Sequence, residues 1–372
     1  MIKNIFTPKR FFLGRWIAPV LILLCSAFVI PVKPVNTIIL QDERLTVNPQ
    51  EFYIQQVTDE RGPGRAVANL ITDATTAQKQ AVDLEGGTAV AIRKFISHNL
   101  PANTALRPVV VRINELKITE TALPGGRIEG KVSINLAFDR KLGDDYIYLL
   151  SYKGSARYIR PDKQQDVIEA TLRRTLVNGL VYLNTWMNRE ADTNPKLAKR
   201  VKLTITDYTD NTDPDTIYYS PKRPLTWDDF KARPATGGKY AAEVFPSIAF
   251  DEEVAVVNSV IEVRLRMKPY LPKSASWVRN GYRDDYTLNH EQRHFDIVKL
   301  AAEHYKRHLL TQQLPITNFD GAIHADYLDA FRDMNNMQQQ YDDETQHGIN
   351  QAAQAQWNER IDKELKSLGV IK

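Results

Sequence analysis

Residues 288–296 of the chain read LNHEQRHFD, and this stretch decides which fold the second half is expected to adopt. It contains the pattern HExxH, with histidines at 290 and 294 and a glutamate at 291. On an α-helix, residues four apart lie on the same face about one turn from each other. Both imidazoles can therefore reach one metal ion at roughly 2.1 Å, the usual length of a zinc–histidine bond.

Glu291 stands beside the two histidines, where its carboxylate can take a proton from a water molecule on the metal. Neutral imidazole ligands and the need for a redox-inert Lewis acid favour zinc as that metal. The pattern thus predicts hydrolysis of amide bonds through a zinc-activated water, with Glu291 as general base.

The sequence around the motif predicts an amphipathic helix over about residues 285–312. Asp284, Asp285 and Thr287 are available as its N-cap. Its buried face is predicted to continue below the motif through four residues: Val298, Ala301, Tyr305 and Leu309. Asp296, two residues after His294, either orients one of the imidazoles from behind or is solvated.

A catalytic zinc needs a third protein ligand, and the candidates lie in YDDETQHG at residues 341–348. This stretch belongs to a helical region predicted over about 323–368 and interrupted near Gly348. An apolar stripe on that helix directs Glu344 inward. Gly348, however, allows the helix to end near His347, and a ligand at a helix end can turn towards the metal. The residues alone leave Glu344 and His347 open.

The second half contains four separated motifs, followed by Gln351 and Trp357. The motifs are LTWDDF at 225–230, SWV at 276–278, LNHEQRHFD at 288–296 and YDxETxHG at 341–348. Together they resemble the bacterial family of predicted secreted zinc-dependent proteases, a domain of unknown function, over about residues 218–368. The resemblance implies an exported zincin-like domain whose zinc is bound by His290, His294 and His347. Glu344 is then a rival third ligand or a partner behind the ligands.

The same resemblance makes Tyr341 a candidate to stabilise an oxyanion, with a place in the core as the alternative. Arg293 departs from what the resemblance implies, since its side chain is bulky for a position that faces a cleft. It either narrows the site or points outward.

The first half, residues 37–195, is predicted to form a separate α+β domain for binding or support. Alternating apolar residues predict strands at 131–139 and 146–152, joined by a turn at 141–144. A further strand over 108–120 changes phase between Ile113 and Leu116, which suggests a bulge. Helices are expected over 88–100 and from about residue 161. This order faintly resembles domains of envelope lipoproteins that assist transporters, which implies an envelope protein partner.

Residues 196–217 are expected to be a linker, and residues 218–372 the zincin-like metallopeptidase domain. Residues 1–36 have basic residues before an uncharged apolar run from Trp16 to Val32. This pattern predicts an export signal, read either as a cleaved signal peptide or as an uncleaved membrane anchor. Because the apolar run continues past Ala27, the anchor is favoured. Cys25 is the only cysteine, so no intrachain disulfide can form.

The 372 residues carry a formal net charge of +4 that is spread along the chain, so a nucleic-acid partner is not expected. The sequence as a whole predicts an α+β protein of the periplasm or cell envelope. Its function would be that of a zinc (Zn2+) metallopeptidase acting on a peptide or protein. A rival that shares the site is a metal-dependent hydrolase of peptidoglycan stem peptides. The alternative is a non-catalytic envelope binding protein with a structural zinc site.

Overall fold

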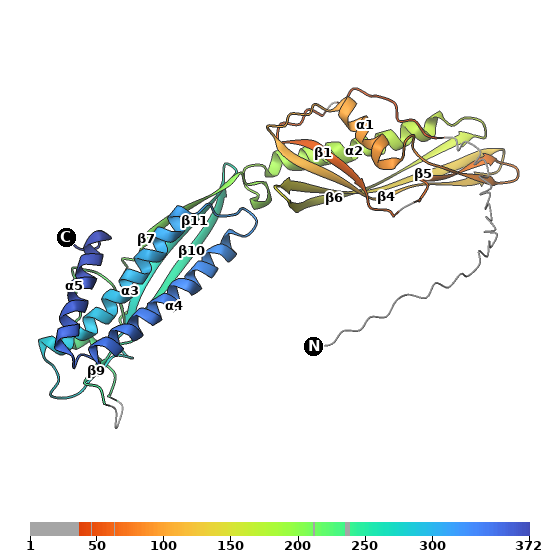
Figure 1. The fold of residues 1–372 in the computed structure, drawn as a ribbon. Helices are drawn as coiled ribbons and strands as arrows, with labels where there is room; N and C mark the ends of the chain where they lie inside the picture. The colour runs from red at the N-terminus through yellow and green to blue at the C-terminus, as the bar shows by residue number, and fades with distance from the viewer. Residues whose placement is uncertain (1–36, 46, 63, 211–212, 235–238) are drawn as a thin grey trace, which may run out of the picture. The chain divides into compact units, whose positions relative to one another are not determined.

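The computed structural model describes residues 37–372 except 46, 63, 211–212 and 235–238, and shows a mixed α+β protein (Figure 1). The export signal predicted over residues 1–36 lies outside the described residues. No helix in the described part is both long and apolar enough to span a membrane.

The first half is built on a six-stranded sheet with the strand order β3-β2-β4-β5-β6, and β1 pairs with β4. The strands are β1 (Phe52–Asp59), β2 (Ala68–Asp73), β3 (Gln78–Val82), β4 (Arg107–Leu123), β5 (Arg127–Leu142) and β6 (Asp145–Pro161). Strands β4, β5 and β6 form an antiparallel meander. The predicted bulge in β4 is confirmed, because the register with β5 shifts between Ile113 and Glu115.

Two helices, α1 (Thr88–Asn99) and α2 (Asp166–Glu190), share one apolar core with this sheet. The core forms because alternate residues of β5, such as Val132, Ile134 and Phe138, turn to the same side. Three short strands, β1 to β3, precede α1. They contribute to the same core through Phe52 and Leu70.

The second half contains a four-stranded sheet covered by helices. The sheet has the order β10-β11-β7, with β8 also paired to β11. Its strands are β7 (Arg200–Asp207), β8 (Thr216–Tyr218), β10 (Ser247–Val257) and β11 (Val260–Pro272), while β9 (Ala242–Glu243) and β12 (Trp277–Val278) form a separate pair. The structure differs from the predicted linker over 196–217. Strand β7 pairs in parallel with β11 and begins directly after the short 3-10 helix η1 (Pro195–Leu197).

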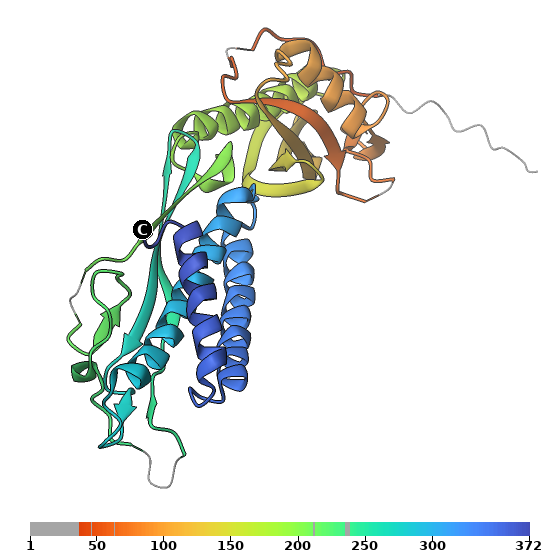
Figure 2. The same ribbon diagram turned by 60° about the vertical axis from the view of Figure 1, so that its left-hand side comes forward.

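Three helices follow the sheet: α3 (Asp285–Thr311), α4 (Phe319–Thr345) and α5 (Gln351–Ser367). They lie side by side in Figure 2 and share a small core that includes Leu300, Tyr341 and Trp357. Helix α3 begins at the predicted cap, where Asp284 accepts a hydrogen bond from the backbone N–H of Thr287 at 2.8 Å. The predicted interruption near Gly348 is confirmed, because residues 346–350 separate α4 from α5.

Candidate metal site

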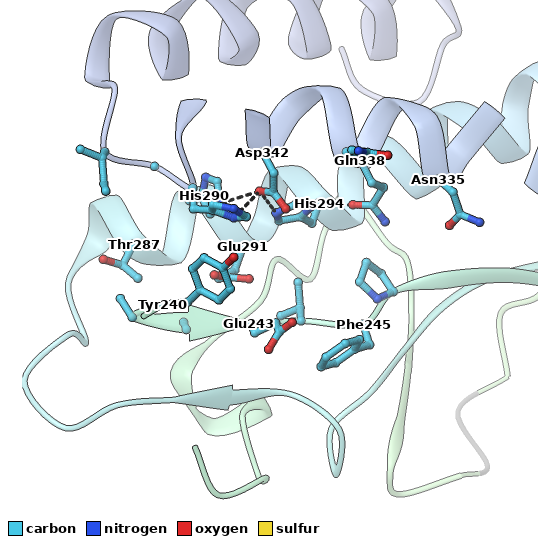
Figure 3. A pocket seen from close by; sticks show the side chains of 18 of the residues that line it. Tyr240, Glu243, Phe245, Thr287, His290, Glu291, His294, Asn335, Gln338 and Asp342 are labelled. Carbon is cyan, nitrogen blue, oxygen red and sulfur yellow. Dashed lines mark hydrogen bonds and ion pairs between the residues drawn. The ribbon is translucent and has the colours of Figure 1, made fainter. Parts of the chain in front are cut away.

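Two imidazoles and one carboxylate meet between α3 and α4. His290 and His294 lie one turn apart on α3, and Asp342 comes from the last turns of α4. The Nε2 atoms of His294 and His290 lie 3.0 Å and 3.4 Å from Asp342 Oδ1. Within the described part of the chain, these side chains offer ligand atoms that all lie within 4.8 Å of one another. Figure 3 shows both rings directed at the carboxylate.

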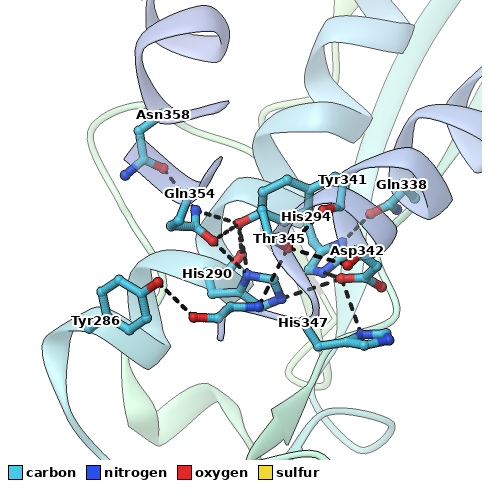
Figure 4. A network of polar contacts seen from close by, with 11 residues as sticks. Tyr286, His290, His294, Gln338, Tyr341, Asp342, Thr345, His347, Gln354 and Asn358 are labelled. Atoms are coloured by element: carbon cyan, nitrogen blue, oxygen red, sulfur yellow. Dashed lines mark hydrogen bonds and ion pairs between the residues drawn. The ribbon is translucent and has the colours of Figure 1, made fainter. Parts of the chain in front are cut away.

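Hydrogen bonds behind His290 fix which of its ring nitrogens carries the proton (Figure 4). Arg293 Nε donates to Asn358 Oδ1 at 3.0 Å, and a guanidinium can only donate. Gln354 Nε2 donates to the same oxygen at 3.0 Å, so Gln354 Oε1 faces His290 Nδ1 at 2.9 Å. Because an amide oxygen only accepts, His290 Nδ1 carries the hydrogen. In the neutral ring, Nε2 then presents a lone pair to Asp342.

His294 is oriented in the same way from another residue of α4. Gln338 Oε1 lies 2.5 Å from His294 Nδ1, which assigns the hydrogen of the neutral ring to Nδ1. Three acceptor atoms therefore converge: the two Nε2 atoms and Asp342 Oδ1. In the described residues, this buried Oδ1 has no hydrogen bond of good geometry. Lone pairs at such distances repel one another unless a positive charge lies among them.

The pKa values of the converging groups respond to this arrangement. Burial alone would raise the pKa of Asp342, but the polar contacts with His290 and His294, together with the charges of His294 and His347, outweigh burial and lower that pKa. Burial would lower the pKa of His294, yet the contact with Asp342 and the charges of Asp342 and Glu291 raise it. Both shifts favour a positive charge at this point, which a proton or a metal ion can supply.

Glu291 lies beside the two histidines and lines a cavity of about 570 Å³ (Figure 3). Only 4% of its surface is exposed. Burial raises the pKa of Glu291, while the charges of His294 and His290 act in the opposite direction. A carboxyl with a raised pKa in a cavity is suited to accept and return a proton near neutral pH.

Tyr341 lies behind the imidazoles rather than in the cavity. Its ring stacks on that of His290 with centroids 4.8 Å apart, and its side chain is fully buried. The hydroxyl lies 2.9 Å from His290 Nδ1 and 2.9 Å from Gln354 Oε1. This position fits the core alternative and does not fit the predicted oxyanion role, because the hydroxyl is on the side of the ring opposite to Nε2.

Asp296, predicted as a possible partner of an imidazole, hydrogen-bonds to other groups. It accepts from Tyr219 Oη at 3.0 Å, from Gln292 Nε2 at 2.8 Å and from Arg293 at 3.0 Å. Arg293 also pairs with Asp362 and is absent from the lining of the cavity, so it points outward and does not narrow the site. Asp296 thus holds Arg293 and not an imidazole. Arg293 in turn orients the side-chain amides of Asn358 and Gln354 behind His290.

The two predicted third ligands occupy different surroundings. Glu344 faces away from the histidines, since its carboxylate accepts hydrogen bonds from Trp357 Nε1 at 2.7 Å and Gln340 Nε2 at 2.7 Å. His347 lies at the cavity, with Nδ1 3.4 Å from Asp342 Oδ1 and its ring 4.2 Å from that of Tyr240. The structure brings His347 to the site but places Asp342 between the three imidazoles.

The backbone after α4 explains the position of His347. Gln346 and His347 both have a φ of 52°, and Gly348 has a φ of 81°, so three consecutive residues are left-handed. This turn reverses the chain and returns His347 to the cavity. A side chain on Gly348 would meet the His290 ring at 3.4 Å and would also be strained at this φ.

Sequence reasoning missed Asp342, Gln338, Gln354 and Asn358 as members of the site. The first two are four residues apart on α4, which is the same spacing as the two histidines and places them on one helix face. That spacing is the signal that could have identified them. Gln354 and Asn358 repeat the spacing on α5.

Comparisons with known proteins add little to this description. No family model matches the chain, and no curated protein matches it. Among solved structures, a Xanthomonas campestris protein of the family DUF330 matches with a TM-score of 0.26 and 9% identity, over 42% of this chain and 98% of its own. A structure titled only as an uncharacterized protein matches with a TM-score of 0.21 and 10% identity, over the same shares of the two chains. Similarity at this level carries no weight for fold or function.

Proposed function

We propose that this protein is a zinc-dependent peptidase of the cell envelope, with the metal bound by His290, His294 and Asp342 and with Glu291 as general base. The observation that carries the proposal is the convergence of two imidazole Nε2 atoms and a carboxylate oxygen on one point, with an amide acceptor behind each ring that favours the tautomer whose Nε2 lone pair faces that point. Two neutral imidazoles and a carboxylate form a common donor set of catalytic zinc sites. The residues therefore fit the metal.

Zinc, when bound, lowers the pKa of water towards neutrality and polarises a carbonyl oxygen. The chain's own residues supply the remaining functions. Glu291 faces the cavity beside the histidines, where it can accept the proton of the attacking water and pass it to the departing nitrogen. His347, at the edge of the cavity, can donate a hydrogen bond to the carbonyl oxygen as negative charge develops.

The place of action in the cell is proposed from the sequence. The basic and apolar segment at residues 1–36 would export the chain to the periplasm and, if uncleaved, tether it to the inner membrane. The first half, with its own apolar core, would bind an envelope protein partner.

A second candidate, a non-catalytic envelope protein with a structural zinc site, is favoured by one observation. His347 Nδ1 lies 3.4 Å from Asp342 Oδ1, beside the three converging side chains, and a closed shell of four protein ligands, which His347 would complete if it joined them, is typical of structural zinc. For a peptidase we expect His347→Ala to keep nearly stoichiometric zinc and to lose activity. For a structural site, His347→Ala would release zinc as readily as His294→Ala does.

The proposed function is tested by separating metal binding from catalysis. We expect Glu291→Gln to retain zinc near one equivalent, measured by elemental analysis of the purified exported portion, and to lower peptide hydrolysis by at least about a hundredfold. His294→Ala is expected to lose both zinc and activity. Equal loss of zinc in Glu291→Gln would contradict the assignment of Glu291 as base, and zinc-loaded protein that cleaves no peptide in a broad library would contradict the peptidase.

A further inference from the structure

Exposed aromatic side chains in the second half gather at the cavity. In the described residues from 199 to 372, the aromatic side chains with large exposure are those of Tyr240, Phe245, Tyr282 and Tyr286. All four line the cavity that contains His290, Glu291 and His294. Single exposed aromatic residues are common on protein surfaces, but a set of rings around a polar centre is typical of a ligand site.

Two of these rings are held in place by the turn that carries His347. The Tyr286 hydroxyl donates to the backbone carbonyl of Gly348 at 2.6 Å, and the Tyr240 ring packs against the ring of His347. Both rings therefore remain fixed while part of their surface stays exposed to the cavity. A ligand that covered this apolar surface would gain its burial at little cost in ordering.

Apart from histidines, the charged side chains in the described lining of the cavity are all acidic. Neither lysine nor arginine is found in the described lining, while Glu243, Glu291 and Asp342 contribute carboxyl groups. Away from the proposed zinc, which is itself a cation, a free carboxylate on a ligand would meet no lysine or arginine in the described lining and would be repelled by Glu243. An uncharged stretch of main chain would not be repelled.

The wall of the cavity is long enough for a chain segment. Eight consecutive residues, 240–247, line it, including β9 and the first residue of β10. A wall made of eight consecutive residues could accompany a ligand on both sides of a cleaved bond. The cavity is thus not shaped only for the end of a chain.

We propose that the site binds internal peptide segments with bulky apolar or aromatic side chains and with no carboxylate beside the scissile bond, which makes the protein an endopeptidase. This inference rests on the proposed function and specifies its substrate class. The acidic lining without lysine or arginine disfavours carboxypeptidase activity and cleavage beside aspartate or glutamate.

The first experiment uses four matched octapeptides: a capped neutral peptide with a central phenylalanine, the same peptide with alanine there, one with aspartate there, and one ending in a free carboxylate next to the phenylalanine. Binding to zinc-loaded Glu291→Gln protein is measured by calorimetry, and cleavage by the wild type is measured by mass spectrometry. We expect the capped phenylalanine peptide to bind at least about tenfold more tightly than each of the others. Equal affinities would overturn the inference.

The two readouts keep this inference apart from the proposed function. Selective binding without cleavage by the wild type would contradict the peptidase and leave the ligand class standing. Cleavage of the carboxylate peptides as fast as the capped peptide would leave the peptidase standing and overturn the ligand class.

Variants at the cavity provide an independent test, made in the zinc-loaded Glu291→Gln protein so that the peptide is not cleaved while its binding is measured. Phe245→Ala should weaken binding of the phenylalanine peptide by about tenfold, whereas Leu328→Ala, at an exposed apolar side chain away from the cavity, should leave it unchanged. Asn335→Lys adds a cation to the lining and should improve binding of the free-carboxylate peptide several-fold. Asn336→Lys, its neighbour outside the lining, is the control. No gain in Asn335→Lys over Asn336→Lys would contradict the electrostatic exclusion.

Discussion

At the scale of single residues, the direction of hydrogen bonds decides what the site can bind. Arg293 has only donors, and this fact propagates through Asn358 and Gln354 to the imidazole of His290. The ring is left with its lone pair towards Asp342. A residue that touches neither metal nor substrate thereby sets the protonation state of a ligand.

We expect Gln354→Met to raise the dissociation constant for zinc by about 10- to 100-fold, because it removes the acceptor that holds the proton on His290 Nδ1. Gln354→Glu keeps an acceptor at this position and should recover most of the affinity. Competition with a chelator of known affinity measures both, and nitrogen NMR of the His290 ring reports the tautomer. Gln356→Met, on the exposed side of α5, is the matched control. If Gln354→Glu bound zinc as weakly as Gln354→Met, the tautomer would not be the cause.

The third ligand can be assigned by neutral substitutions within one turn of helix. We expect Asp342→Asn to weaken zinc binding by about a hundredfold or more, since the loss of a ligand should exceed the effect of losing a partner behind one. Glu344→Gln should bind zinc like the wild type, because its carboxylate faces Trp357 and Gln340. Asp343→Asn, which is exposed, controls for the change in charge. A reversal of the first two results would restore the sequence-based rival.

The sequence predicted the residues that one helix brings together and missed those that other helices supply. His290, Glu291 and His294 follow from the periodicity of α3 alone. Asp342 follows Tyr341, so it lies at the side of the apolar stripe of α4 and not on it. Only the packing of α4 against α3 brings its carboxylate between the two histidines. Glu344 was predicted to face the metal because the apolar stripe was extended to the end of α4. In the last turn of that helix, the Glu344 carboxylate accepts a hydrogen bond from Trp357 of α5 instead.

At the scale of elements, strands were found from their alternation, but their faces were not always predicted. Tyr146, Tyr148, Leu150 and Tyr152 alternate as if they shared one face of β6. A register shift opposite Phe138 and Asp139 breaks that face, so Tyr146 and Tyr148 are exposed while Leu150 is buried. Period two cannot reveal an inserted residue unless the apolar phase also slips, as it does in β4.

Strand β7 was expected to be a linker because its neighbourhood is basic and polar, yet it is fixed to α3 by charge. Asp207, at the end of β7, accepts from Lys299 Nζ at 2.9 Å and from Lys306 Nζ at 3.0 Å. Burial would raise the pKa of Asp207, but the charge and hydrogen bond of Lys299, with those of Lys306, outweigh it and lower that pKa.

We therefore expect Asp207→Asn to be less stable than the wild type at neutral pH, by about 1 kcal/mol after allowing for the partial exposure of Asp207. An aspartate with a lowered folded-state pKa stabilises the protein above its unfolded pKa of 3.8, and this contribution is lost as pH falls through the lower folded value. The difference in melting temperature between the two proteins should thus shrink below about pH 4. Asp210→Asn is a control of the same charge nearby. A pH-independent difference would indicate lost packing rather than lost charge.

At the scale of the whole molecule, the apolar residues divide into separate cores. The buried residues of one core lie between 47 and 197, and those of two others lie between 198 and 365, without a shared member. The helices that surround the site, α3, α4 and α5, contribute only to the two cores formed by residues after 197. Effects of metal binding should accordingly be confined to one part of the chain.

Removal of zinc tests this division, because the metal would join α3 to α4 through His290, His294 and Asp342. Ligands that bind only the folded state stabilise it in proportion to their affinity, so a chelator should lower the melting temperature of the second half. In hydrogen exchange followed by mass spectrometry, we expect protection to fall in residues 286–298 and 334–348, and in α5 through Gln354. Protection in β4 and β5 should be unchanged, since their core contains no residue of the second half. His294→Ala should show the same pattern without chelator. Equal loss of protection in β4 and β5, or no loss anywhere, would mean that the convergent side chains do not hold a metal that supports the fold.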